Sequence, residues 1–288
     1  MRGDDNMHLN MFVSQRCFIY CKGCYSHSRE EKCGEMINTE TALNFLKYAN
    51  KKGIKKITIC GGDPLTRPDI IDLLKEIKKI GYYISLDTLG TSILKEIKIN
   101  SKLTIPKTSA KELARTVDMI GIPIDGSTNK IFSLFRPTKD EIVNQQIEIC
   151  NELHKYGADI CINTVLHKGN ADDIFEIAEI IKSLEYVKKW QIFEFEPFGK
   201  FGKLNKDLFE ISEKRFLEIK DEIEKKYNDD RIQFKNSKIR NKLYILIDNS
   251  GDAYVSSTCN LKRNNRRIIG NIKEEKDWPK IVRYLKMK

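Results

Sequence analysis

Three cysteines lie within eight residues near the start of the chain, in the segment CFIYCKGC at positions 17–24. The spacing of Cys17, Cys21 and Cys24 allows one curled loop to direct three thiolates toward a single metal site. A structural zinc site prefers four ligands, and two pairs of closely spaced cysteines would indicate one, but the second pair is missing. A cubane iron–sulfur cluster held by three thiolates keeps one iron open to another ligand. The spacing therefore predicts such a cluster, with its fourth ligand supplied by a substrate or cofactor.

The alternative for this segment is a zinc site completed by Cys33 or His27. Three further cysteines, Cys60, Cys150 and Cys161, lie in apolar runs and are interpreted as buried small hydrophobic residues. Eight cysteines in 288 residues, with three crowded together, fit a reducing compartment better than a disulfide framework. We therefore expect metal-ligating thiols in a cytoplasmic protein.

The composition is that of a globular protein, with 40% hydrophobic and 32% charged residues. A length of 288 residues fits one α/β barrel, or one core with a small extension. No apolar run approaches the roughly 18 residues of a membrane helix, and the first ten residues, MRGDDNMHLN, lack the apolar stretch of a secretion signal. We therefore expect neither a membrane partner nor export.

The formal net charge of +10 attracts polyanions, so nucleic acid, a membrane surface and an acidic substrate are all compatible with it. The basic groups at 51–56 and 75–79 lie on or beside amphipathic helical patterns, where a solvated outer face is expected. A third basic group lies in NLKRNNRR at 260–267, which is the one candidate for a contact patch.

Short apolar runs alternate with helical patterns along the first two thirds of the chain, which predicts β-α units and a parallel sheet. Helical patterns at 38–53 and 68–81 each end in glycine, a common helix C-cap. The crossover at about 91–116 is irregular. Six strands are expected, at 8–13, 56–60, 82–87, 118–124, 158–166 and 188–197. The fold class is therefore α/β, a partial (β/α)6 TIM-like barrel over residues 7–204.

The pattern changes after FGKFGKLNK at 198–206, which is typical of a linker. One long charged helix is expected from Asp207 to Tyr227, followed by short antiparallel strands in RIQF, LYILID and DAYVSS. Residues 205–288 are thus expected to form a separate small α+β extension. The cysteine loop follows the first barrel strand, so it lies at the C-terminal edge of the sheet, where α/β folds place their chemistry.

The C-x3-C-x2-C loop after a first strand, with Gly-Gly-Asp-Pro after a second, resembles the radical S-adenosylmethionine (SAM) enzymes over roughly residues 7–200. Resemblance to this superfamily implies a [4Fe-4S] cluster on the three cysteines, with SAM chelating the open iron. It further implies that reductive cleavage of SAM yields a 5′-deoxyadenosyl radical, which takes a hydrogen atom from the substrate. An electron donor such as flavodoxin or ferredoxin is implied as a partner.

Other motifs are similar to the superfamily in the same order, and the resemblance implies their roles. The loop whose backbone holds the methionine amino group is matched, with glycines that permit close approach, by Gly61, Gly62, Asp63 and Pro64. Thr88, in LDTLG, is placed near the cofactor. Asp125 and Arg136 become candidates for contacts with the ribose and carboxylate of SAM. Asn163 and Asn170 lie in a segment that resembles the molybdenum-cofactor and peptide-modifying branches.

The chain departs from the superfamily pattern beside the third cysteine. Gly23 replaces the usual aromatic residue, so the expected adenine contact passes to Tyr25 or to the backbone. The alternative interpretation of Thr88 and Asp125 is that they end strands or cap helices. For Arg136 the alternative is an ion pair at the surface.

The strand-turn-strand pattern of LYILIDNSGDAYVSS and the later Gly-Asn-Ile resemble the C-terminal (SPASM-like) domain of peptide-modifying relatives, with most cysteines absent. This resemblance favours a peptide substrate and peptide maturation. Cys259 supplies too few cysteine ligands for an auxiliary iron–sulfur cluster, so no such cluster is expected. A small metabolite or nucleotide is the alternative substrate, because the basic loop at 260–267 can hold a phosphate.

Glu194 and Glu196 alternate with Phe193 and Phe195 on the sixth strand, which makes both carboxylates candidate catalytic residues facing the barrel interior. Equally, they can flank a solvent opening. A second class of function is a non-enzymatic, zinc-stabilised module that binds nucleic acid; the charge fits it, whereas the Gly-Gly-Asp-Pro loop and the six-strand rhythm disfavour it. Nucleic acid is therefore not the expected partner.

Overall fold

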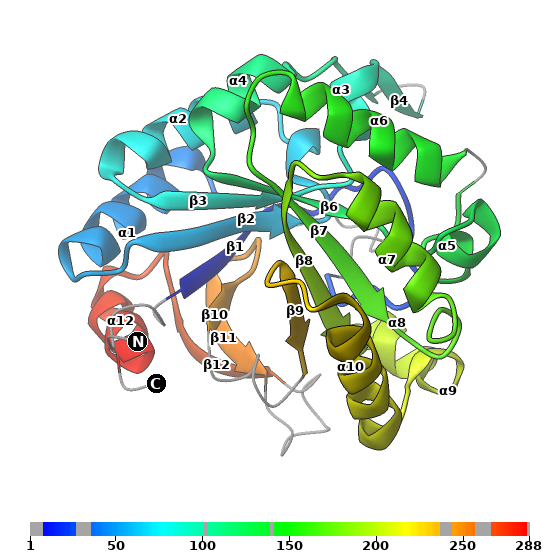
Figure 1. Cartoon of the computed structure of the whole chain (residues 1–288). Helices are drawn as coiled ribbons and strands as arrows, with labels where there is room; N and C mark the ends of the chain where they lie inside the picture. The colour runs from blue at the N-terminus through cyan, green and yellow to red at the C-terminus, as the bar shows by residue number, and fades with distance from the viewer. Residues whose placement is uncertain are drawn as a thin grey trace.

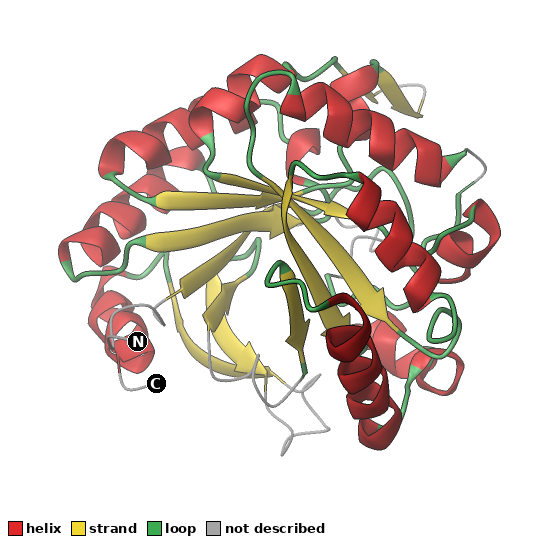
Figure 2. Cartoon of the chain, in the orientation of Figure 1, coloured by secondary structure: helices red, strands yellow, loops and turns green. Residues whose placement is uncertain are grey.

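The computed structural model describes residues 8–26, 36–100, 103–138, 141–236, 244–256 and 266–286. Within them, the chain forms a ten-stranded sheet in the order β12-β11-β10-β1-β2-β3-β6-β7-β8-β9, together with a separate hairpin, β4-β5. Neighbouring strands from β10 to β9 run parallel, and β11 and β12 extend the sheet antiparallel at one edge. The sheet curves into an open barrel with helices along its outer side (Figure 1, Figure 2).

Six of the parallel strands form the barrel wall expected from the sequence. They are β1 His8–Ser14, β2 Lys56–Gly61, β3 Tyr83–Asp87, β6 Met119–Pro123, β7 Ile160–Leu166 and β8 Val187–Glu194. The main outer helices are α1 Thr39–Lys51, α2 Ile70–Ile80, α4 Ala110–Thr116, α6 Ile142–His154 and α7 Ile174–Ser183. Shorter elements are η1 Pro64–Thr66, α3 Thr91–Leu94, β4 Ile97–Asn100, β5 Leu103–Ile105 and α5 Asn129–Phe135. The predicted α/β fold with a partial barrel is confirmed.

Helix ends follow the caps that the sequence offers. Helix α1 begins after Asn38, whose side chain accepts a hydrogen bond from Thr41 N–H at 2.7 Å. Helix α2 ends at Gly81, whose φ of 96° lies in the left-handed region that glycine adopts easily. None of the helices within the described ranges has the length and apolar character needed to cross a bilayer.

The two faces of each barrel strand carry different side chains, because successive residues point to opposite faces. On the outer face, apolar residues such as Leu9, Ile57 and Ile192 are fully buried in the large core that packs against the helices. We call the space enclosed by the inner face the lumen. Residues of the opposite alternation line it, including Asn10, Asp87, Asn163, Lys189, Gln191 and Lys235. The lumen side therefore carries polar residues alongside an apolar cluster that includes Phe12, Cys60 and Leu246, whereas the outer core is apolar.

One half-buried histidine on this inner face, His8, predicts that the stability of the protein is sensitive to acid. His8 Nε2 is hydrogen-bonded to Thr58 Oγ1 at 2.6 Å, and burial, aided by the charge of Lys56, lowers the pKa of His8 to about 4. The unfolded chain therefore binds a proton more readily, so stability present above about pH 6.5 is lost as the pH falls toward 4. Between pH 7 and pH 5 we expect a loss of about 1–2 kcal/mol from His8.

Urea unfolding of the wild type and of His8→Gln at both pH values measures this contribution. The variant should lose less stability on acidification than the wild type. Replacing the exposed His154 with glutamine serves as the control and should leave the pH dependence as it is in the wild type. Equal pH dependence in the wild type and His8→Gln would contradict the prediction.

The expected linker at 198–206 is wrong, because this segment forms helix α8, Gly199–Leu204, and starts α9, Lys206–Phe209. Its first glycine serves close packing: a Cβ on Gly199 would lie 3.0 Å from the backbone oxygen of Tyr25. The glycine content that suggested flexibility thus reflects contact with the segment after the third cysteine.

The expected single helix from Asp207 to Tyr227 is interrupted. Helix α9 ends at Phe209, and α10 spans Glu213–Tyr227. Between them, the Ser212 side chain accepts a hydrogen bond from Arg215 N–H at 3.1 Å and caps a new helix.

The strands expected after α10 are present, and they join the barrel sheet. The remaining elements are β9 Ile232–Lys235, β10 Tyr244–Ile247, β11 Asp252–Ser256, β12 Arg266–Asn271, η3 Glu275–Asp277 and α12 Trp278–Lys286. Strands β10 and β11 pair antiparallel, as expected, and β12, which was not among the expected strands, pairs antiparallel with β11. In contrast, β9 pairs in parallel with β8, and β10 pairs in parallel with β1. The domain boundary between residues 204 and 205 stays a prediction.

Candidate cofactor site

Two loops meet at the C-terminal edge of the parallel strands: the cysteine loop after β1 and the Gly-Gly-Asp-Pro loop after β2. Gly62 N–H donates to Ser14 O at 2.7 Å, and Asp63 N–H donates to Arg16 O at 2.6 Å. These two bonds lie directly before Cys17. They fix the glycine loop against the start of the cysteine loop.

The cysteine loop is itself held from two sides. Cys24 N–H donates to Cys21 O at 3.3 Å and closes a turn within the loop. Lys22 N–H donates to Phe135 O at 2.9 Å, at the end of α5. Asn205 Nδ2 donates to Lys22 O at 2.8 Å, from the junction of α8 and α9. Segments more than a hundred residues away thus define the shape of this loop.

The thiols of this loop influence one another electrostatically. Burial raises the pKa of Cys17 well above its usual value, and the negative charges of Asp63 and of the other two thiols raise it further. Burial also raises the pKa of Cys21 to about 11, although the Arg136 cation opposes this rise. Without a metal, Cys17 and Cys21 are therefore protonated at neutral pH, so metal binding must displace their protons.

The donor set fits a three-thiolate iron–sulfur cluster. Cys21 is buried, whereas Cys17 and Cys24 are partly exposed. Among the described residues, no three His, Cys, Asp or Glu side chains lie close enough together to hold one metal ion. A cubane takes one thiolate on each of three irons, so its ligands need not converge on one atom. His27 and Cys33, which would complete the alternative zinc site, lie outside the described residues.

Asp63 joins the loops that follow β2 and β3, and only 1% of it is exposed. Its carboxylate accepts hydrogen bonds from Leu65 N–H at 3.0 Å, Leu89 N–H at 2.7 Å and Thr88 Oγ1 at 2.8 Å. Burial raises the pKa of Asp63 to about 6, and these donors limit the rise. Both Asp63 and Thr88 therefore fix loops beside the cysteines. Contacts of these side chains with SAM stay predictions.

Arg136 places a cation beside the cysteine loop. Its Nη1 donates to Cys21 Sγ at 3.5 Å, and its Nε forms an ion pair with Asp125 Oδ2. Although burial lowers the pKa of Arg136, the charges of Asp125 and Cys21 raise it above its usual value, so the guanidinium stays charged. The Asp125 side chain is fully buried, and its second oxygen accepts from Val165 N–H at 2.7 Å. Asp125 is thus enclosed beneath Arg136, and its contact with the ribose of SAM stays a prediction.

The structure explains why glycine occupies position 23. A Cβ on Gly23 would lie 2.3 Å from the Phe135 ring and 2.8 Å from the Phe195 ring. Two phenylalanines from distant elements therefore fill the space of the aromatic residue expected there. Tyr25 is 41% exposed, with its ring 5.7 Å from that of Phe12. Its contact with adenine stays a prediction.

Strand alternation does not direct Glu194 into the lumen as expected. Trp190 and Ile192 belong to the outer core, and Glu194 follows them in the same alternation at the end of β8. Phe193 takes the lumen side instead. Glu196 lies beyond the strand. A catalytic role for either carboxylate stays a prediction.

An aromatic wall beside the cysteines could not be assigned from the sequence. Phe135, Phe195 and Phe209 form a buried cluster with Cys21. His167 stacks on Phe135 with ring centroids 5.3 Å apart. Such apolar surroundings limit water access, one of the properties that sets the reduction potential of an iron–sulfur cluster. In the sequence, the one sign of this wall was that Phe135 and Phe195 are direct neighbours of residues already chosen as candidate site residues.

The basic patch expected at 260–267 is described only at its end. Arg266 donates to Asp248 Oδ2 at 3.1 Å and lies over the Tyr254 ring at 4.5 Å. Arg267 lies over the Tyr284 ring at 5.8 Å. Both arginines therefore pack within the extension. Cys259 and residues 260–265 lie outside the described part of the chain.

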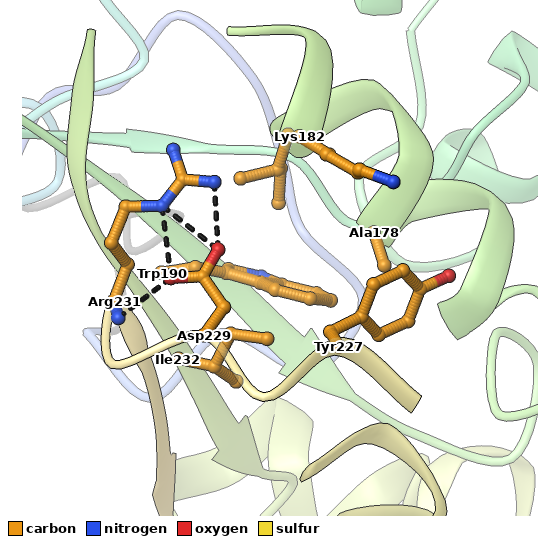
Figure 3. A pocket seen from close by; sticks show the side chains of 8 residues that line it. Ala178, Lys182, Trp190, Tyr227, Asp229, Arg231 and Ile232 are labelled. Atoms are coloured by element: carbon orange, nitrogen blue, oxygen red, sulfur yellow. Dashed lines mark hydrogen bonds and ion pairs between the residues drawn. The ribbon is translucent and has the colours of Figure 1, made fainter. Parts of the chain in front are cut away.

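Two pockets lie away from the lumen. The one in Figure 3 lies between α7, the turn before β9 and the outer side of β8, and its volume is about 10 Å³, room for about one water. There Arg231 Nη2 donates to Asp229 Oδ2 at 2.7 Å, a structural ion pair (Figure 3). The other is a cleft of about 270 Å³ beside the cysteine loop, lined in part by Phe18, Ile19 and Leu89. Of the two, only this cleft adjoins the candidate site.

Comparison with known proteins agrees with this architecture. The sequence profile of the Radical SAM superfamily matches residues 11–181. An S-adenosylmethionine-dependent nucleotide dehydratase from Flammeovirga pacifica is 25% identical over 256 residues, covering 84% of this chain and 80% of that protein. A probable GTP 3′,8-cyclase from Saccharolobus islandicus is 25% identical over 226 residues, covering 76% of this chain and 68% of that protein.

Solved structures share the fold. SuiB from Streptococcus suis, bound to its precursor peptide SuiA, superposes with a TM-score of 0.69 at 13% identity, over 86% of this chain. The chain spans 58% of the length of that SuiB chain. SuiB bound to S-adenosylmethionine superposes with a TM-score of 0.67 at 14% identity, over 93% of this chain and 64% of that one.

A partial α/β barrel with a three-cysteine loop at its C-terminal edge defines a class of enzymes that use SAM with an iron–sulfur cluster. The chain belongs to the radical SAM superfamily. It is accordingly an enzyme whose cofactors are a [4Fe-4S] cluster and SAM.

Proposed function

We propose that Cys17, Cys21 and Cys24 hold the [4Fe-4S] cluster and that the backbone of residues 61–64 binds the methionine group of SAM. The observation that carries this proposal is the pair of hydrogen bonds from Gly62 and Asp63 to the backbone directly before Cys17. A cluster held there would supply the electron for reductive cleavage of SAM at its sulfonium, and the resulting radical would take a hydrogen atom from a substrate held in the lumen.

The other residues of the site fix the positions of its loops, bind SAM or limit the access of water. Thr88 and Asp63 hold the loop after β3 against the glycine loop. Arg136, charged and beside Cys21, is the group we assign to the SAM carboxylate. The phenylalanine cluster beside Cys21 limits water near the radical. Flavodoxin or ferredoxin is the proposed electron donor, and a cytoplasmic location fits such a donor.

For the substrate we propose a peptide as the first candidate. The fold likeness to SuiB, whose structure contains a precursor peptide, supports it. The second candidate is a nucleotide or another small anion. The two curated relatives support it, since they are named for reactions on nucleotides.

Anaerobic reconstitution tests the proposed reaction. The purified chain should take up about four irons and four sulfides. With SAM and dithionite it should form 5′-deoxyadenosine, detectable by liquid chromatography and mass spectrometry. A reconstituted protein with zinc in place of iron, or with a cluster but no 5′-deoxyadenosine, would overturn the proposal.

A further inference from the structure

Large apolar side chains gather at the surface around the cysteine loop. Among the described residues, nine such side chains are exposed, and five of these lie in or beside the cysteine loop, on α5, and on α8 and α9: Tyr20, Tyr25, Leu134, Leu204 and Leu208. Leu204 is the most exposed of the nine, at 74%. Apolar side chains that gather at one place on a surface, unlike scattered ones, indicate a binding surface.

The three segments that carry these side chains contact one another. Asn205 Nδ2, between α8 and α9, donates to Lys22 O at 2.8 Å in the cysteine loop. The rings of Phe135 on α5 and Phe209 on α9 lie with their centroids 5.1 Å apart. The exposed apolar side chains therefore belong to one part of the surface, where α5, α8 and α9 lie together (Figure 1).

This part of the surface lies over the buried thiol of the cysteine loop. Each of the three segments directs one residue inward, and Cys21, Phe135 and Phe209 pack in one buried cluster. The residue directly before each of these in the sequence is exposed: Tyr20, Leu134 and Leu208. The same short segments thus form the exposed surface on one side and the surroundings of Cys21 on the other.

Three exposed lysines lie among these apolar side chains. Lys22 is in the cysteine loop, Lys200 is on α8, and Lys168 follows β7. Lys168 N–H donates to Phe209 O at 3.0 Å, which places this lysine beside α9. We call the surface formed by the following exposed side chains the docking face: Tyr20, Lys22, Tyr25, Leu134, Lys168, Lys200, Leu204 and Leu208.

Positive charge predominates in the segments that form the docking face. Residues 17–25 and 129–135 contain one lysine each and no carboxylate. Residues 199–210 contain three lysines and two carboxylates, and one of these carboxylates, Glu210, forms an ion pair with Lys206 at 3.4 Å. A partner that complements this face is therefore acidic.

We propose that the docking face binds an acidic protein that delivers single electrons to the cluster. This inference rests on the proposed function, because it requires a cluster on the cysteine loop. A protein donor must bring its own redox centre close to the cluster, and the docking face covers Cys21. Redox partners form small, transient interfaces, and opposite charges on the two proteins speed their encounter.

The proposed step is an electron transfer between two proteins. The reduced donor loses one electron and the oxidised cluster gains it, while no bond is formed or broken and no proton moves. The oxidised donor then leaves the docking face and is reduced again elsewhere. Flavodoxin and ferredoxin, the donors proposed above, both carry single electrons.

A comparison of two kinds of reductant tests the inference. The reconstituted enzyme receives electrons either from dithionite or from an acidic protein, a flavodoxin or a plant-type [2Fe-2S] ferredoxin that has been reduced photochemically. With the protein donors, Lys168→Glu/Lys200→Glu should form 5′-deoxyadenosine at least about 10-fold more slowly than the wild type. With dithionite it should match the wild type, because a small reductant needs no docking face. Lys47→Glu/Lys111→Glu is the control, since it reverses the same charge at exposed positions of α1 and α4 and should behave as the wild type does.

A second variant and a binding measurement examine the apolar part of the docking face. Leu204→Asp should slow the reaction with the protein donors alone, whereas Leu217→Asp, at an exposed position of α10, should not. Isothermal titration of each reconstituted variant with oxidised donor measures affinity without turnover, and this affinity should fall together with the donor-driven rate. Raising the salt concentration from about 50 to about 300 mM should slow the donor-driven reaction of the wild type more than that of the lysine variant.

Three results would overturn the inference. The first is an unchanged donor-driven rate and donor affinity in Lys168→Glu/Lys200→Glu, and the second is a wild type that neither protein donor reduces. The third is an equal loss of rate with dithionite, because the docking face would then serve the substrate, SAM or the fold. Failure of the proposed function is distinct from all three, since the wild type would then form no 5′-deoxyadenosine with dithionite.

Discussion

Replacing Cys21 with alanine should abolish formation of 5′-deoxyadenosine. Cys21 is the buried thiol of the cysteine loop, packed against three phenylalanines and beside Arg136. Removing it leaves two thiolates for a cluster that needs three. Replacing a residue that only contacts a metal ligand typically lowers metal affinity or activity about 10–100-fold. Replacing the ligand itself should therefore lower activity more than about 100-fold.

Iron and sulfide analysis together with 5′-deoxyadenosine assays measures this effect. Cys150→Ala is the matched control, because Cys150 is also fully buried but lies on α6. It should lose some stability and keep its iron, sulfide and activity per folded protein. If Cys21→Ala retained the cluster and the cleavage of SAM, the ligand assignment would have to be abandoned.

The barrel could be predicted because its signals are local. Strand alternation and helix caps, such as Asn38 and Gly81, are contained within one element and its neighbours. The linker prediction failed for the opposite reason. Gly199 was interpreted from composition, whereas its role depends on contact with Tyr25, which is far away in the sequence.

The candidate site divides in the same way. The cysteine spacing and the Gly-Gly-Asp-Pro segment are short motifs, so the sequence displays them directly. The role of Asp125 depends on Arg136 and on the backbone of β7, and a lone aspartate carries no sign of such partners. Sequence alternation alone misplaced Glu194, because the side that faces the lumen is set by which neighbours pack against helices.

The inward position of Lys235 was hidden from the sequence for a further reason. β9 follows a long helix and was expected to belong to a separate antiparallel unit. Only its parallel pairing with β8 brings Lys235 onto the same inner face as Lys189. Pairing between strands distant in sequence is not encoded in local periodicity.

Gly62→Ala should also impair the enzyme severely and reduce SAM cleavage about 100-fold. A displacement of about 1 Å at a reacting group can have an effect of this size. An added Cβ would lie 2.2 Å from Arg16 O and 2.7 Å from Gln15 O, which are backbone atoms. The glycine loop must therefore move away from the cysteine loop, which weakens the hydrogen bonds from Gly62 and Asp63. Overpacking of this kind also costs about 1–3 kcal/mol of stability.

Gly53→Ala provides the control, because a Cβ there meets nothing within 4 Å, although its φ of +92° makes alanine strained. That variant should lose about 1 kcal/mol or somewhat more of stability and keep full SAM cleavage in its folded fraction. Measuring cleavage, SAM affinity and unfolding free energy for both variants separates general strain from loop displacement. Because the added methyl group meets main-chain oxygens instead of a flexible side chain, rotamer changes cannot relieve the contact. Full SAM cleavage by folded Gly62→Ala would mean that the spacing between these two loops does not position the cofactor.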